Sequence, residues 1–175
     1  MSNKLFGENF ESNWLDSMAS GHGNLIYQNL GGNNPACYVN FSSNQSISCG
    51  ASVWSKLNFN NVIFNVGTCW DTTNHYFIAP EDGYYIITVN IVMSLNAGPS
   101  ESSYLRLINS GDSEEDAYTL AYEWFGRQNL DLTHVFRCNQ GDTITPMVTA
   151  GGVAGNRTFY YDACYFSGIF IARRT

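Results

Sequence analysis

The chain has 175 residues, of which 15% are aromatic and only 13% charged, and its net charge is −7. This length suits one well-filled core rather than two, and the excess of aromatic over charged residues argues against disorder. The acidic balance argues against nucleic acid as a partner, because phosphates need a basic surface. No run approaches the roughly 20 apolar residues that cross a bilayer, so we expect no membrane partner.

The first 34 residues differ in texture from the rest of the chain. Large apolar side chains recur there at intervals of four, a spacing that places them on one side of a short helix over residues 8–19. They are Phe6, Phe10, Trp14 and Met18. A helix this short needs a partner surface, either on its own domain or on another protein. We therefore predict an N-terminal arm, residues 1–34, that is in part helical and can act as a tether.

From residue 35 to residue 175 the pattern indicates a single all-β domain. Short runs rich in Val, Ile, Thr, Tyr and Phe alternate with clusters of Asn, Gly and Ser, which are typical of turns. About ten short strands at this spacing indicate a sandwich of the jelly-roll type.

The clearest strand prediction covers Tyr84–Ser94. Its alternate residues form one apolar face, comprising Tyr85, Ile87, Val89, Ile91 and Met93. Thr88, Asn90 and Ser94 lie on the opposite face. The preceding segment, Pro80–Gly83, has the proline and glycine of a turn.

Two further elements are predicted in the C-terminal half. Asn139–Asp142 is predicted to form the turn of a hairpin between residues 130–137 and 143–149. The last run, residues 158–172, is apolar or aromatic on both faces near Tyr165–Ile171, as expected for a strand buried on both sides.

Motifs of catalysis or metal binding are missing from the sequence. The three histidines stand in separate segments, and none has a nearby Asp, Glu or Cys at metal-ligand spacing. The acidic run Asp112–Asp116 indicates either a solvated loop or a calcium site to which its side chains supply oxygen ligands. The five cysteines are scattered and odd in number, so we expect mostly buried thiols, with a disulfide as the alternative. We predict no enzyme activity, no resident metal and no cofactor.

A set of short motifs resembles the globular head shared by complement C-one-q and tumour-necrosis-factor-like proteins, and looks closest to the bacteriophage branch of that family. The motifs run in order from residue 35 to residue 171. They are Pro35–Val39, Asn44–Ile47, Lys56–Phe59, Val62–Asn65, Asp71–Pro80, Gly83–Tyr85, Gly141–Asp142 and Tyr165–Ile171.

The resemblance implies a ten-stranded jelly roll that assembles as a homotrimer around a threefold axis. Four aromatic residues are the candidates for the trimer interface, with packing in the chain's own core as the alternative for each. They are Tyr85, Tyr165, Phe166 and Phe170.

The resemblance also suggests a role. We expect a non-enzymatic structural protein of a virion, a trimer that decorates or cements a phage capsid after assembly in the host cytoplasm. Its arm would bind the major capsid protein or another virion protein. The alternative is the receptor-binding head of a tail fibre or tail knob, and a hydrolase of cell-wall sugar is a third class.

Overall fold

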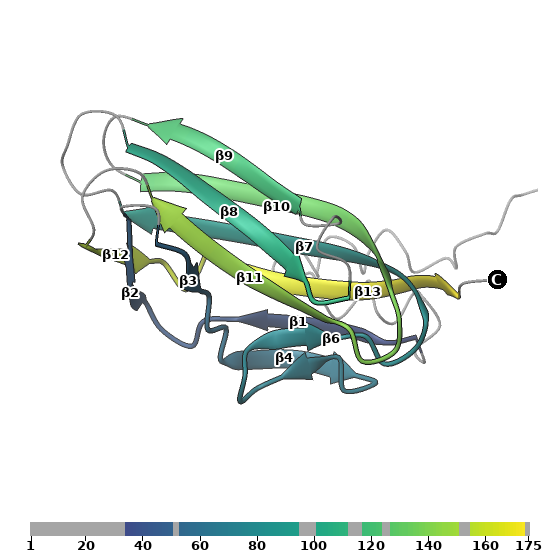
Figure 1. Cartoon of the computed structure of the whole chain (residues 1–175). Coiled ribbons are helices and arrows are strands. Elements are labelled where there is room, and N and C mark those ends of the chain that lie inside the picture. Colours follow the sequence, from purple (N-terminus) through teal and green to yellow (C-terminus); the bar gives the residue numbers. More distant parts are fainter. Residues whose placement is uncertain are drawn as a thin grey trace, which may run out of the picture.

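The computed structural model describes residues 34–50, 53–94, 101–111, 117–123, 127–150 and 155–173. These residues form thirteen strands and no helix. The strands lie in two antiparallel sheets that face each other (Figure 1). The predicted all-β jelly-roll sandwich is confirmed. The strand number exceeds ten because short segments such as β3 (Ser55–Lys56) and β5 (Trp70–Asp71) pair separately.

The first sheet has seven strands, and β7 lies at its centre. Its path is β2 (Gln45–Cys49), β12 (Gly155–Phe159), β7 (Gly83–Ser94), β13 (Tyr165–Arg173), β1 (Ala36–Asn40) and β4 (Asn61–Val66). Strands β12 and β13 share one edge of β7, β12 at Met93 and β13 from Gly83 to Asn90. The seventh strand, β10 (Arg127–Cys138), pairs with the opposite edge of β7 over its full length.

The second sheet has six strands. Its path is β5, β6 (Tyr76–Ile78), β11 (Thr143–Ala150), β8 (Glu101–Asn109) and β9 (Ala117–Glu123). The short strand β3 also pairs with β11, beside Met147 and Val148.

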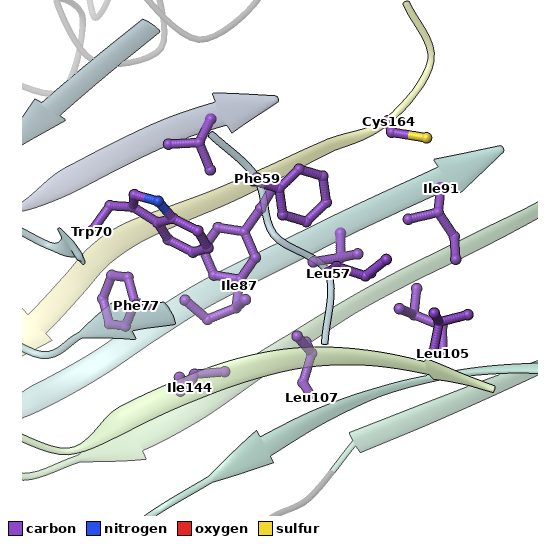
Figure 2. Packing of buried hydrophobic residues seen from close by; sticks show 14 of the residues in the cluster. Leu57, Phe59, Trp70, Phe77, Ile87, Ile91, Leu105, Leu107, Ile144 and Cys164 are labelled. Carbon is purple, nitrogen blue, oxygen red and sulfur yellow. The ribbon is translucent and has the colours of Figure 1, made fainter. Parts of the chain in front are cut away.

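The core lies between the two sheets. On β7 the five residues predicted for the apolar face are all fully buried, because alternate residues of a strand point to the same side. Leu105 and Leu107 of β8 and Ile144 of β11 come from the opposite sheet. Figure 2 shows these side chains meeting Ile87 and Ile91 between the strands.

Aromatic rings fill the centre of this core. The Phe166 ring lies 4.7 Å from the Trp70 ring and 6.3 Å from the Phe59 ring, measured between centroids. Phe59 in turn stacks on Phe41 at 4.5 Å. Offset and tilted contacts of this kind stabilise a core beyond the area that they bury.

The turn at Asn139–Asp142 exists, but its interpretation as a hairpin is wrong. The strand before it, β10, pairs with β7 in the seven-stranded sheet, whereas the strand after it, β11, belongs to the six-stranded sheet. The turn therefore carries the chain from one sheet to the other. Asp142 stabilises it by accepting a hydrogen bond from the backbone nitrogen of Asn139 at 2.7 Å, and Gly141 has φ of +91°.

The last predicted run divides into two strands. A turn between Phe159 and Tyr165 separates β12 from β13. Burial of β13 on both faces is not found in the single chain, because Ile169 is only half-buried and Ile171 is 46% exposed.

Some predictions lie outside the described residues. These are the arm, with Phe6, Phe10, Trp14 and Met18, and the acidic run Asp112–Asp116. Within the described ranges, no helix is long and apolar enough to span a membrane.

Candidate interaction surface

The outward face of the seven-stranded sheet, defined by the side chains that point away from the core, is the candidate functional surface. Three rows of side chains run across β10, β7 and β13, because the register of the three strands places every second residue side by side. The rows change from apolar to polar along the strands.

The apolar row consists of Val135, Ile86 and Ile169, which are direct cross-strand partners. Val135 is 49% exposed and Ile86 37% exposed. Next to this row, Tyr84 and Ile171 are also exposed. Large apolar side chains gathered on one exposed sheet face are typical of a protein–protein contact.

The middle row combines hydroxyl groups with rings. Thr88 pairs with Thr133 and with Ser167, and the Thr88 and Thr133 hydroxyls share a hydrogen bond of 3.0 Å. Farther along the row, Tyr38 stacks on Phe64, with centroids 6.2 Å apart. Small hydroxyl side chains here let a second surface approach the sheet closely.

The polar row contains Asp131, Asn90 and Tyr165. The Tyr165 ring stacks on Tyr38 at 5.5 Å, so the two rings connect the polar row to the middle row. Burial raises the pKa of the Tyr165 hydroxyl, and the negative charge of Asp131 raises it further. Burial likewise raises the pKa of the Tyr38 hydroxyl, so both tyrosines remain neutral hydrogen-bonding groups across the physiological range.

The four predicted interface residues do not lie together on this surface. Tyr85 and Phe166 are fully buried between the sheets and Phe170 is almost so, with its ring 5.3 Å from that of Tyr85. Side chains without exposed surface leave no area for a second copy, so the alternative of core packing describes these three residues. Tyr165 alone is on the outward face.

The residues that do form the outward face carried a signal in the sequence. Residues 84–87 of β7 are all large and apolar, so both faces of the strand have apolar side chains. The sequence made Tyr85 a candidate for the trimer axis, with packing in the core as the alternative. Alternation alone cannot tell which face of such a strand lies inside; the pairing with β10 and β13 decides it.

No site of metal or nucleophilic chemistry stands out in the part of the chain that the structure describes. Among those residues, no group of three or more His, Cys, Asp or Glu side chains could hold a metal ion. All five cysteines are buried, and none of them forms a disulfide. Burial raises the pKa of Cys69 to about 12 and that of Cys164 to about 11, which keeps both thiols protonated and unreactive at neutral pH.

Comparison with known proteins shows the fold. No protein-family model matches the sequence, and no curated protein matches it. The structure is similar to the globular domain of the zebrafish complement 1qA protein, with a TM-score of 0.59 and 18% identity over 81% of this chain and 99% of that chain. It is also similar to the Eiger tumour necrosis factor of S. frugiperda, with a TM-score of 0.55 and 13% identity over 81% and 95% of the two chains. The chain thus has the jelly-roll fold of the complement C-one-q and tumour-necrosis-factor-like heads.

Proposed function

We propose that this protein is a non-enzymatic structural protein that works as a homotrimer, with the outward face of the seven-stranded sheet at the contacts between copies. The observation that carries the proposal is the apolar row Val135–Ile86–Ile169. Its apolar area is left in water in a single chain, and burying it against the same row of other copies would stabilise the assembly.

The gradient along the face supports this arrangement. The copies would pack most tightly at the apolar row, while the polar row with Asp131 would stay nearer solvent, since a charge is costly to bury without a partner. Interface centres are apolar and poor in charge, and their rims are polar.

A matched pair of variants tests the contact surface. Ile86→Asp places a charge in the apolar row, and Leu120→Asp makes the same kind of change on the six-stranded sheet, where Leu120 is 39% exposed. Sedimentation velocity should show single chains for Ile86→Asp and three chains for Leu120→Asp. Trimers of both variants, each with normal thermal unfolding, would move the contact away from this face.

We further propose that the trimer decorates or cements a bacteriophage capsid and is held there by residues 1–34. The support comes from the sequence, namely the resemblance of the motifs between residues 35 and 171 to the phage branch and the apolar side chains spaced along the arm. Three arms on one trimer would bind together and raise the strength of attachment well above that of one arm.

Deletion of residues 1–30 tests the location and the anchor at once. The truncated protein should form a folded trimer that no longer attaches to purified particles, and Phe10→Ala together with Trp14→Ala should weaken attachment in the same way. Immunolabelling confined to the tail would instead favour the receptor-binding head of a tail fibre. Normal attachment of the truncated trimer would refute the tether.

A further inference from the structure

The outward face of the six-stranded sheet forms a second ordered surface, remote from the rows described above. Strand β11 pairs with β8 on one edge and with β3 and β6 on the other, and these pairings arrange the side chains in three rows of half-buried or buried residues. The middle row consists of Lys56, Met147 and Arg106, which are cross-strand partners. In the rows on either side, Thr149 pairs with Tyr104 and Thr145 pairs with Ile108. Trp54, two residues before Lys56, and Tyr76, the first residue of β6, extend these two outer rows at the opposite edge of β11. Two cations thus occupy the middle row, between rows that carry aromatic rings.

Each cation lies against a ring of a neighbouring row. The Lys56 ammonium is 5.5 Å from the centroid of the Tyr76 ring, and the Arg106 guanidinium is 5.9 Å from that of Trp54. The Trp54 ring packs edge-on against Tyr104, with centroids 6.5 Å apart. These contacts hold the rings in place, so the protein would lose little side-chain freedom when a ligand binds.

The Lys56 ammonium keeps capacity for a ligand. It donates one hydrogen bond of 2.9 Å to the carbonyl oxygen of Asn74, and an ammonium group has three donors. The middle row places Lys56 and Arg106 on either side of Met147, two strand spacings or about 10 Å apart. The three rows contain no acidic side chain, but Asp71, the cross-strand partner of Tyr76, brings a carboxylate beside the third row. That carboxylate accepts hydrogen bonds from the backbone nitrogens of Thr73 and Asn74.

From this arrangement we infer that the outward face of the six-stranded sheet binds an acidic saccharide. The flat apolar faces of two rings of one saccharide chain fit against Trp54 and Tyr76, whose rows lie four residues or roughly 13 Å apart along β11. A carboxylate between these two rings fits the ammonium of Lys56 in the middle row. The inference requires one copy of the chain and is independent of the trimer and of the virion.

An acidic saccharide fits this surface better than a nucleic acid does. A nucleic acid bears a phosphate on every nucleotide, and the acidic chain would repel so dense a charge. A saccharide with carboxylates on some of its rings needs few cations and uses the aromatic surface for the rest of its contact.

Calorimetric titration of the full chain with a short hyaluronate oligomer, in which every second ring carries a carboxylate, tests the inference. The wild type should bind the oligomer, and should bind its methyl ester, which lacks the charge, more weakly. Lys56→Gln should weaken binding of the acid about fivefold, the effect of an exposed ion pair. Trp54→Ala should weaken it about tenfold through the loss of stacking.

Arg173→Gln is the matched control, because it removes one exposed cation from the other sheet and should leave binding unchanged. If Trp54→Ala does not fold, Tyr76→Leu replaces it and should give the same direction of change. The inference is overturned if the wild type does not bind the acid, if the methyl ester binds as tightly, or if Arg173→Gln weakens binding as much as Lys56→Gln. Tighter binding of a thymidine oligonucleotide would also overturn it, in favour of nucleic acid.

Discussion

Tyr84 and Tyr85 are neighbours in the chain and lie on opposite faces of β7. Tyr84 is 39% exposed on the outward face, whereas Tyr85 is fully buried, and its hydroxyl donates a hydrogen bond of 2.8 Å to the carbonyl oxygen of Glu81. The same residue type thus belongs to the candidate contact surface in one position and to the core in the next, because successive side chains of a strand alternate.

The pair supplies a controlled test of the core. Tyr85→Phe removes the hydrogen bond to Glu81 and should lower the free energy of unfolding by about 1 kcal/mol. Tyr84→Phe removes an identical hydroxyl from the contact surface outside the core, where the ring remains to pack against other copies, and should change it by less than about 0.5 kcal/mol. Urea unfolding at one fixed protein concentration measures both variants. Equal effects of the two would contradict the assignment of the faces.

The sequence predicts the fold well where its pattern has one reading. The strand over Tyr84–Ser94, the all-β sandwich and the turns around Pro80–Gly83 and Asn139–Asp142 follow from alternation and turn chemistry. The pairing partners of the strands do not follow from these local patterns. A turn between two strands looks alike in a hairpin and in a crossing between sheets, and only long-range pairing tells that β10 and β11 belong to different sheets.

The same limit explains the outcome for the candidate site. Tyr165, a candidate for the trimer interface, lies on the outward face, whereas the candidates Phe166 and Phe170 lie inside. All three are aromatic in a strand with apolar residues on both faces, so their spacing reveals that two sets exist without revealing which set is inside.

Gly168 of β13 is expected to tolerate no side chain. A Cβ atom added there would lie 2.7 Å from a ring carbon of Phe77 and 3.0 Å from the terminal methyl of Ile87, both packed in the core. Gly168→Ala should therefore lower the free energy of unfolding by about 1–3 kcal/mol through overpacking. Ser167→Ala, one residue earlier and on the outward face, is the control and should unfold nearly as the wild type does.

Alkaline pH should destabilise the folded chain. Burial raises the pKa of Cys164 from about 9 to about 11 and that of Cys69 to about 12. Thiols of the unfolded chain therefore lose their protons first, and rising pH favours unfolding. The contribution of these thiols is fully present below pH 9 and decreases through pH 11–12 as the folded chain also deprotonates.

Urea midpoints between pH 7.5 and 11 check this expectation. Cys164→Ala should show a smaller decrease of stability over the same pH range, because one of the titrating thiols is gone. If the urea midpoint of the wild type does not decrease as the pH rises from 9 to 11, the thiols are accessible to water in the folded chain.

The central claim is that the outward face of the seven-stranded sheet is covered by other copies of the chain. Sedimentation equilibrium of the full-length wild type in dilute neutral buffer tests it most directly. The predicted mass is three times the 19.5 kDa of one chain, and it should persist on dilution to nanomolar concentration because the apolar rows are buried together. A stable, well-folded species of 19.5 kDa would contradict the claim and leave Val135, Ile86 and Ile169 as a surface for a different partner.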